Sequence, residues 1–387
     1  MRTASRIDKI PPYLFASLDR KVSAARAKGV DVISFGVGDP DLPTPAHIVE
    51  AAAEAVRDPS THQYPSYYGM KEFREAIARY YSRRFSVELD PDSQILPLIG
   101  SKEGIAHLAT AFVDNGDTVL VSDPGYPVYA VTAIMAGGTP VSIPLQREKG
   151  FLPDFASIGG AAQGAKIMWL NFPGNPTGAV AGERTFSDAI DLAREHDLLV
   201  AHDAAYSEIT FDGYSAPSVL QTDGALESAV EFGSLSKTFN MTGWRVGWVA
   251  GAEKAIEALG RVKTNIDSGI FNAIQRAGIA ALDGPTKSLE DVLAVYARRR
   301  DALVSTLNSS GWDVKSPLGS IYLWAPLPEG ETSGGYAEYL LEEAGIVVAP
   351  GAGYGEHGEG YIRFSLTVPD ERLDEGLERL AKALASR

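Results

Sequence analysis

The sequence predicts an α/β protein in two parts: a large three-layer α/β/α domain with a mostly parallel sheet, and a smaller α+β domain. Two observations lead to this prediction. Between about residues 95 and 250, short β-rich runs that are apolar on both faces alternate with helix-like segments, which is typical of strands in a helix-covered sheet. From about residue 285 onward, the pattern changes to a long helical stretch, two strand-like runs and a terminal helix.

The strand-like runs of the large domain are short and rich in apolar and β-branched residues. They are DTVLVS (117–122), TPVSIPL (139–145), AKIMWLNF (165–172), LLVAHDA (198–204), AVEFGSL (229–235) and WRVGWVAG (244–251). Helix-like segments such as GIAHLATAFV and ERTFSDAIDLAREHD lie between these runs. We expect those helices to cover both faces of the sheet.

The small domain should begin with a long helix over 288–310. Strands are expected in IYLWAPL and YIRFSLTV, followed by a helix over 371–386. The N-terminal arm is expected to pack onto this part of the chain. We therefore assign residues 36–280 to the large domain, and residues 1–35 with 281–387 to the small domain.

The composition excludes several classes of function. With 35 basic and 50 acidic residues the formal charge is −15, which disfavours nucleic acid and anionic membranes as partners. The chain has no cysteine, so it has no disulfide and no thiolate metal site. Its six histidines include no pair at the helical spacing of metal ligands, and no metal is expected. No signal-peptide pattern or membrane-length apolar run is present, so a cytoplasmic location is expected.

The most informative run is FGSLSKTFNMTGWRVGWV, which places Lys237 after the strand-like stretch AVEFGSL. Hydroxyl groups lie close in sequence at Ser234 and Ser236, and Arg245 follows eight positions later. Most lysines are solvated surface charges. A lysine among small and apolar residues loses its proton more easily and can act as a nucleophile.

Other polar residues also follow strand-like runs, where ligands bind in open α/β sheets. Ser101 and Lys102 begin a helix, which suits a phosphate, although Ser101 could be only a helix cap. Asn175 lies in NPTG, which is also a common turn sequence. Asp203 and Tyr206 follow the strand LLVAHDA, and a carboxylate there needs a cationic or protonated partner.

The glycine-rich loops GVGDPD and GAGYGEHG do not match the dinucleotide-binding pattern, and no P-loop sequence occurs. The ordered set of strand-end residues, together with the aromatic run DPGYPVY, instead meets the needs of pyridoxal 5'-phosphate. That cofactor requires a phosphate cradle, a ring to stack on, an acid for its ring nitrogen, donors for its phenolate oxygen and a Schiff-base lysine.

With these motifs the chain resembles the fold type I, class I/II aminotransferases over essentially its whole length. The segments GSKEGIAHL, HDAAYSEI and NIDSG are similar to the bacterial branch of LL-diaminopimelate aminotransferases. The resemblance implies a homodimer with shared active sites. It also implies amino-group transfer between glutamate or 2-oxoglutarate and an amino acid, which in that branch is LL-diaminopimelate, made from tetrahydrodipicolinate.

The resemblance also implies a role for individual residues. Lys237, Asp203 and Tyr206 would be catalytic: the lysine as Schiff base and general base, the aspartate beside the ring nitrogen, and the tyrosine with Asn175 at the phenolate oxygen. Tyr126 would stack on the ring. The phosphate would be bound by Ser101, Lys102, Ser234, Ser236 and Arg245, and by Tyr64 of a neighbouring subunit. The substrate would contact Arg363, Gly38, Asn175, Tyr13, Lys102 and Asn265, with Arg363 at the α-carboxylate.

One departure leaves the substrate open. The loop HQYPSYYGM differs from that of the plant-type diaminopimelate enzymes, so Lys102 and Asn265 are only candidates for binding the distal end of the substrate. Alternatives are a broader aminotransferase for aspartate, alanine or aromatic amino acids, and a lyase or decarboxylase with the same cofactor and fold. A ligand-sensing regulator would need a DNA-binding domain, for which the chain has neither the length nor the charge. A cofactor-free structural protein would lack the cofactor's absorbance.

Overall fold

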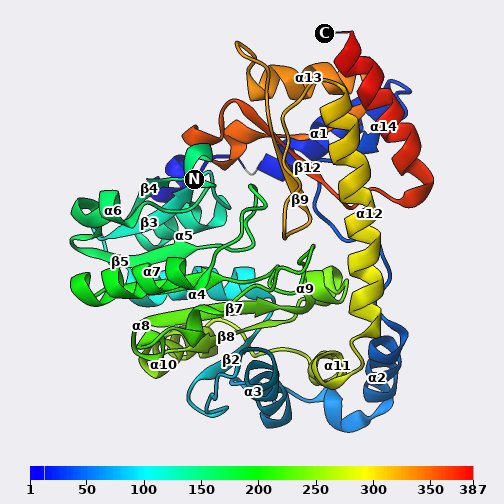
Figure 1. The fold of residues 1–387 in the computed structure, drawn as a ribbon. Coiled ribbons are helices and arrows are strands. Elements are labelled where there is room, and N and C mark those ends of the chain that lie inside the picture. The colour runs from blue at the N-terminus through cyan, green and yellow to red at the C-terminus, as the bar shows by residue number, and fades with distance from the viewer. Residues whose placement is uncertain (13, 387) are drawn as a thin grey trace.

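The computed structural model describes residues 1–12 and 14–386, and it has the predicted α/β architecture (Figure 1). Its centre is a mostly parallel seven-stranded sheet, in which β8 alone runs in the direction opposite to the other six strands. The strands lie in the order β2 (Ile95–Leu98), β8 (Gly247–Gly251), β7 (Ala229–Ser234), β6 (Leu199–Asp203), β5 (Ala165–Leu170), β3 (Thr118–Asp123) and β4 (Thr139–Pro144).

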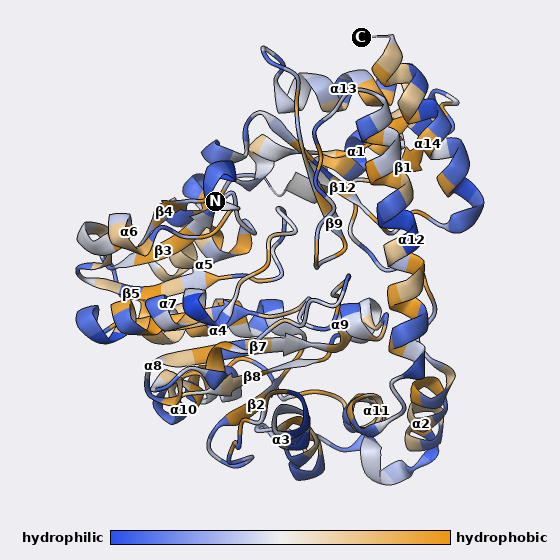
Figure 2. Ribbon diagram, in the orientation of Figure 1, coloured by the Kyte–Doolittle hydropathy of each residue, from blue (hydrophilic) through white to orange (hydrophobic). Residues whose placement is uncertain are grey.

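Alternate residues of the central strands face two separate hydrophobic clusters, which makes the domain three layers thick. On one face, Trp169 and Phe232 pack with α4 (Ser101–Phe112), α5 (Val128–Ala136) and α10 (Glu253–Thr264). On the other face, Met168 and Val200 belong to the cluster that contains residues of α3 (Lys71–Phe85), α6 (Phe155–Ala162), α7 (Glu183–His196) and α11 (Asn272–Asp283). Figure 2 shows the central strands mostly in hydrophobic colours and α7 with alternating ones.

Two of the predicted strands behave differently in the structure. TPVSIPL was expected to be buried on both faces, but β4 is an edge strand and most of its residues are partly or fully exposed. WRVGWVAG was expected to be a strand throughout, but its first three residues precede β8. Arg245 has φ of +53°, a left-handed conformation that an extended strand cannot contain.

The second part of the structure contains a three-stranded antiparallel sheet in the order β11 (Ala349–Pro350), β12 (Tyr361–Ser365) and β9 (Tyr322–Pro326). The expected helices are present as α12 (Lys287–Ser309) and α14 (Asp370–Ala385), and α13 (Ser333–Ala344) lies between β9 and β11 in sequence. In Figure 1, α12 runs along one side of the molecule from the level of α11 up to α14.

The N-terminal segment is tied to this second part. After α1 (Leu14–Ala27), strand β1 (Ile33–Ser34) pairs in parallel with β10 (Ile346–Val347). Leu18, Val32 and Val347 form a small hydrophobic cluster there. The domain limits at 36–280 stay a prediction, and Ile209 and Phe211 from within that range contribute to the core around β9 and β12.

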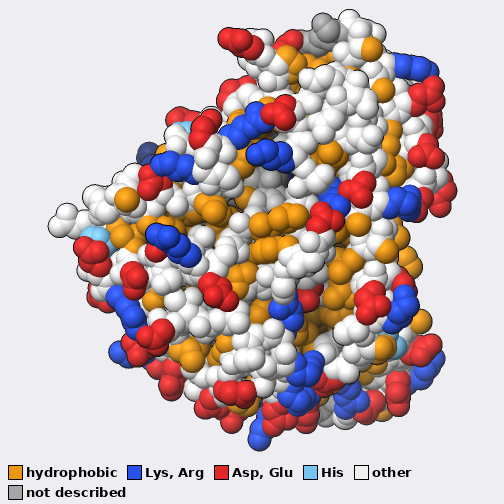
Figure 3. All heavy atoms as spheres, in the orientation of Figure 1, with side chains coloured by type: hydrophobic (Ala, Val, Ile, Leu, Met, Phe, Trp, Pro, Cys, Tyr) orange, Lys and Arg blue, Asp and Glu red, His pale blue; other side chains and the backbone are white. Residues whose placement is uncertain are grey.

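The remaining helices are α2 (Ala46–Arg57), which packs against α11, and the short α8 (Ala225–Ser228) and α9 (Leu235–Thr238). Within the described residues, no helix has both the length and the apolar character that crossing a membrane requires. Figure 3 shows acidic and basic side chains interspersed over one face of the molecule.

Candidate active site

A cavity of about 340 Å³ lies where β6 and β7 end, between the central sheet and the second part of the chain. It collects most of the residues singled out in the sequence. Eleven of these line it: Gly38, Ser101, Lys102, Tyr126, Asn175, Asp203, Tyr206, Ser234, Ser236, Lys237 and Arg245. The strand ends bring these residues together because parallel strands end at one edge of a sheet.

Lys237 lies in α9, the short helix that directly follows β7. The hydroxyl of Ser234 caps this helix by accepting a hydrogen bond from the N–H of Ser236 at 3.1 Å. The ammonium of Lys237 donates to the carbonyl oxygen of Gly38 at 2.9 Å. Burial disfavours the charged form and lowers the pKa of Lys237 below its ordinary value, which makes its amine more available as a nucleophile.

Asp203, the last residue of β6, is a buried carboxylate with an incomplete set of partners. Its Oδ2 accepts a hydrogen bond from the hydroxyl of Tyr129 at 2.8 Å. Its Oδ1 is buried and has no hydrogen-bond partner among the described residues. Burial raises the pKa of this carboxyl. A buried carboxylate oxygen without a donor is unfavourable, so the cavity suits a ligand that brings an N–H group to it.

The start of α4 and Arg245 form one corner of the cavity. Gly100, the residue before the helix, has φ of +76°. A Cβ at this position would lie 2.2 Å from Nη2 of Arg245, so the close approach requires glycine. The guanidinium is held by a 2.8 Å hydrogen bond from Nη1 to the carbonyl of Thr242. A helix start with free N–H groups beside a guanidinium is a good binding site for a phosphate.

Arg363 lies at the opposite side, in the middle strand β12, and its side chain is fully buried. From the residue pattern of YIRFSL alone, Arg363 is expected to be an ordinary charge at a strand edge. Its Nη1 donates to Oδ1 of Asn175 at 2.8 Å, and its Nη2 donates to the carbonyl of Gly36 at 2.7 Å. Its guanidinium carbon lies 3.8 Å from the centre of the Tyr322 ring.

Tyr322 connects Arg363 with the rest of the site. Its hydroxyl accepts a 3.1 Å hydrogen bond from that of Tyr206. Burial alone would raise the pKa of Tyr322, but the charges of Arg363 and Lys237 outweigh burial and hold that pKa below its usual value. A Cβ on Gly38 would lie 2.0 Å from the Tyr322 hydroxyl, so glycine is required where the chain passes this ring.

Among the described residues, two predicted site residues lie on the surface away from the cavity. Tyr64 is 86% exposed, in the loop before α3. Asn265 is exposed at the end of α10, where its Nδ2 donates to the carbonyl of Arg261. Tyr13 lies outside the described residues. The prediction that Asn265 binds substrate therefore has no support within one subunit.

Tyr129, Asn171 and Tyr322 also belong to the site, although the sequence did not lead to their prediction. Tyr129 could have been found, since it lies in the aromatic run DPGYPVY three residues after Tyr126. Asn171, at the end of AKIMWLNF, donates from Nδ2 to the carbonyl of Asp203 at 2.7 Å. Tyr322 gave no signal, because in IYLWAPL it has the pattern of a core aromatic residue.

Comparison with known proteins decides the family. The model of the family "Aminotransferase class I and II" matches residues 30–380 of the chain. The chain belongs to the class I and II aminotransferases. An LL-diaminopimelate aminotransferase of Desulforudis audaxviator is 55% identical to this aminotransferase over 382 residues, which is 98% of this chain and 97% of the relative.

Solved structures of similar proteins also have this fold. Substrate-bound BacF from Bacillus subtilis is 37% identical and superimposes with a TM-score of 0.95, covering 99% of this aminotransferase and 98% of that chain. An aspartate aminotransferase from Thermus thermophilus with maleate is 30% identical, with a TM-score of 0.92 and coverages of 99% and 100%.

The residues of the cavity fit the pyridoxal phosphate expected from the sequence. Oδ1 of Asp203 lacks a donor, which the protonated ring nitrogen of the cofactor would supply. The corner formed by Gly100, Ser101 and Arg245 offers an anion site. Lys237 lines the same cavity with a lowered pKa.

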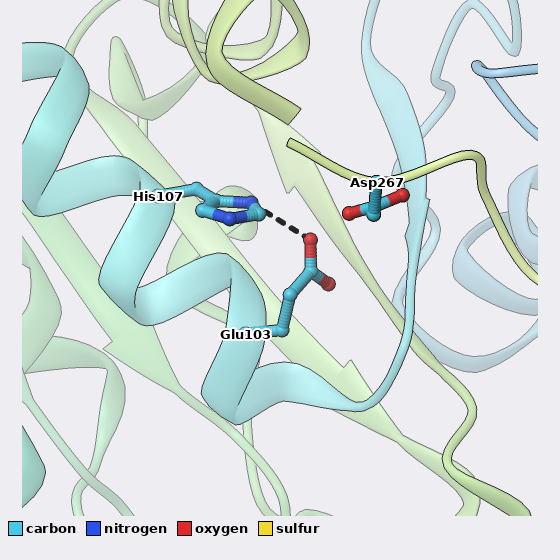
Figure 4. Close-up of side chains that lie close together, drawn as sticks. All are labelled: Glu103, His107 and Asp267. Carbon is cyan, nitrogen blue, oxygen red and sulfur yellow. Dashed lines mark ion pairs between the residues drawn. The ribbon is translucent and has the colours of Figure 1, made fainter. Parts of the chain in front are cut away.

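A second group of titratable side chains lies outside the cavity. Figure 4 shows Glu103 and His107 of α4 pointing toward each other, with Asp267 close by. Their ligand atoms lie within 4.8 Å of one another, a spacing that could hold a metal ion. The ammonium of Lys263, however, already lies 3.1 Å from Oε1 of Glu103 and 2.9 Å from both oxygens of Asp267. A cation of the protein thus occupies the place that a metal would take.

Proposed function

We propose that this aminotransferase uses pyridoxal 5'-phosphate to move an amino group between glutamate or 2-oxoglutarate and LL-diaminopimelate, the latter formed from tetrahydrodipicolinate. The cofactor assignment depends on two residues that line one cavity. Lys237 is desolvated, and Asp203 is buried with no donor at its Oδ1. The substrate assignment is supported by the name of relatives that share half or more of the sequence over nearly its full length.

Each side chain in the cavity would have a defined task. Lys237 would hold the cofactor covalently and, when released by the substrate, take the proton from the substrate α-carbon. When bound, the cofactor supplies an electron-accepting ring that stabilises the negative charge left on that carbon. Asp203 would keep the ring nitrogen protonated, since an opposite charge in a buried site favours the charged form of its partner.

The remaining groups would orient the cofactor and the substrate. Asn175 would donate to the phenolate oxygen, and so would Tyr206 once its hydroxyl proton turns from Tyr322 to the cofactor. Tyr126 would pack on the ring. Ser101, Lys102, Ser234, Ser236 and Arg245 would surround the phosphate. The released Lys237 amine would donate to the carbonyl of Gly38, 2.9 Å away, which keeps its nitrogen close to the reacting carbon.

Arg363 would bind the α-carboxylate of the substrate as a two-donor fork. The side chain is prepared for this role because Asn175 and Gly36 fix two of its nitrogens and the Tyr322 ring packs on its face. A guanidinium that is already oriented loses little conformational freedom when the substrate binds.

We also propose that the protein acts as a homodimer in which Tyr64 reaches the phosphate of the neighbouring subunit. The exposure of Tyr64 in a single chain supports this role, because a large aromatic side chain that is 86% exposed gains stability when a partner covers it. The cytoplasmic location, and the absence of nucleic-acid and membrane partners, stay predictions from the sequence.

The substrate assignment is tested by measuring kcat/KM for several amino donors with 2-oxoglutarate as acceptor. LL-diaminopimelate should exceed aspartate, alanine and phenylalanine by at least about a hundredfold, since a site that pairs both ends of a substrate rejects molecules lacking one end. Comparable values for aspartate or phenylalanine would instead indicate the broader aminotransferase. Release of ammonia or pyruvate without amino transfer would indicate a lyase.

A further inference from the structure

The buried ion cluster around Lys263 has no part in the chemistry described so far. The Lys263 side chain is 1% exposed, and its ammonium contacts Glu103 and Asp267, which come from two different segments. The Nδ1 atom of His107 lies 2.8 Å from Oε1 of Glu103 (Figure 4). A buried cation is tolerated only with such partners, so the three charged groups are held in one arrangement.

One side of the cluster fixes the turn that begins the phosphate corner. Glu103 lies in the first turn of α4, and its Oε2 accepts a 2.9 Å hydrogen bond from the N–H of Ile99. This bond closes the turn through Gly100, whose backbone lies against Arg245, and so sets the position of Ser101. Glu103 therefore connects the ammonium of Lys263 with the backbone at the proposed phosphate site.

The other side fixes an exposed loop. Asp267 accepts a 2.7 Å hydrogen bond from the N–H of Gly269. A Cβ on Gly269 would lie 2.9 Å from the carbonyl of Ser66, so this loop packs closely on the loop that carries Tyr64. We call the exposed apolar side chains on and around these two loops the aromatic face: Tyr64, Tyr67, Tyr68, Ile266 and Phe271, which are 41–86% exposed.

We propose that Glu103, Lys263 and Asp267 act as positioning residues that couple cofactor binding in one subunit to its association with a second copy of this chain. The aromatic face is taken as the surface that the second copy covers, so the inference rests on the proposed homodimer and cofactor. Phosphate binding restricts the turn at Gly100, the cluster transmits that restriction to the loop at Asp267, and the loop orders the aromatic face. By linkage, association tightens cofactor binding by the same factor.

The test compares the dimer dissociation constant with and without pyridoxal phosphate, measured by fluorescence-detected sedimentation. In the wild-type protein, removing the cofactor should weaken the dimer by roughly tenfold, within the usual range for coupled sites. Asp267→Asn and Glu103→Gln each remove one charge next to Lys263 and keep the shape. Each variant should bring the ratio of the dimer dissociation constants without and with cofactor close to one. The double variant should do no more than either single variant, because both break the same connection.

Glu257→Gln is the matched control. Glu257 lies on α10, the helix that carries Lys263, and pairs at 3.4 Å with Arg261 in solvent, where both side chains are at least 71% exposed. This variant should keep the wild-type ratio. Cofactor affinity is titrated by absorbance at protein concentrations above and below the dimer dissociation constant. It should differ tenfold between the two concentrations in the wild-type protein, and this difference should be lost in the cluster variants. Circular dichroism confirms that each variant is folded, and Glu103→Gln replaces Asp267→Asn if the latter does not fold.

Two results would overturn the coupling while leaving the homodimer and the proposed function in place. In one, the cluster variants unfold at lower temperature but keep the wild-type ratio, which would make the cluster merely structural. In the other, the wild-type dimer has the same dissociation constant with and without cofactor while amino transfer is normal; the proposed function then stands. A wild-type protein that stays monomeric with bound cofactor would contradict both the homodimer and the coupling, and lack of cofactor binding would contradict the proposed function itself.

Discussion

At the scale of single residues, the site is defined by groups that are unfavourable in isolation. Asp203 is buried with one oxygen lacking a donor, and Lys237 is desolvated enough to lower its pKa. Such groups persist in a fold when the bound cofactor compensates for them. Their types could be predicted from the sequence, because a carboxylate and a lysine directly after apolar strands stand out. Tyr322 could not be, since nothing in IYLWAPL distinguishes it from a core residue.

Asp203 makes the stability of the cofactor-free protein depend on pH. Burial raises its pKa above the ordinary 3.8, so the folded state keeps this proton to higher pH than the unfolded state does. Stability then falls as pH rises from the ordinary pKa through the raised one, and the loss persists above it. Cofactor-free Asp203→Asn should therefore melt about 2 °C higher than the wild-type protein at pH 8. This difference in melting temperature should become smaller as the pH approaches 4. Thermal unfolding at several pH values measures this, and an equal gap at all pH values would contradict it.

The contact between Gly38 and Tyr322 gives a second prediction at this scale. A methyl group on Gly38 would overlap the Tyr322 hydroxyl, so the chain or the ring must shift at the point where Lys237 is held. Gly38→Ala should lower kcat/KM by about a hundredfold, as small displacements in a catalytic site do. Gly159→Ala is the control, because a Cβ there meets nothing within 4 Å. Steady-state kinetics compare the two, and near-normal turnover of Gly38→Ala would show that the site adapts.

At the scale of elements, the strands and long helices could be predicted because their hydrophobic patterns are strong. The exceptions have local causes. Strand β4 is exposed because edge strands have one neighbour, and a sequence does not reveal strand order. The start of β8 is delayed by the left-handed Arg245, whose conformation depends on its contact with Gly100 rather than on local preference. Strands β10 and β11, with two residues each, are too short to give a pattern.

Helix α12 supports the loop that carries Gly38. Its Arg299 is 1% exposed and donates to both oxygens of Asp41, at 2.7 and 2.8 Å, and to Asp370 at 2.8 Å. Asp41 lies three residues after Gly38, so Arg299 fixes that loop against the helix. Two of the three charged groups, Asp41 and Asp370, keep contact with solvent. The network therefore contributes less to stability than a fully buried ion pair would.

Arg299→Met should consequently lower the stability by about 2 kcal/mol, between the values typical of exposed and buried pairs. It should also raise KM, because the Gly38 loop is less well held. The neighbouring Arg298 pairs with Asp370 at 2.6 Å but is 56% exposed, so Arg298→Met is the matched control and should change stability by less than about 1 kcal/mol. Urea unfolding and steady-state kinetics measure both effects; equal destabilisation by the two variants would contradict the assigned role of Arg299.

At the scale of the whole molecule, one chain contains nearly all of the expected site, but Tyr64 and Asn265 lie on its surface. The sequence could indicate these residues only through a resemblance to dimeric enzymes, because no pattern in one chain encodes which residues serve a neighbour. Their position on loops outside the cavity is consistent with a contribution across a subunit interface.

Mixing two inactive variants tests the shared site. In a hybrid of Lys237→Ala and Tyr64→Ala subunits, one site has a native Lys237 from its own chain and a native Tyr64 from its partner. Random mixing makes about half of the dimers hybrid, so activity should recover to about a quarter of wild type. If Tyr64 serves its own subunit, or serves no site, mixing recovers nothing beyond the sum of the two variants.

The central claim is that Lys237 carries the cofactor. Borohydride reduces a Schiff base to a stable amine, so treating the cofactor-loaded protein with it and mapping the peptides by mass spectrometry locates the attachment directly. We expect a phosphopyridoxyl group on the peptide that contains Lys237, and none in Lys237→Ala. Labelling of Lys102 instead, or labelling that persists in Lys237→Ala, would contradict it.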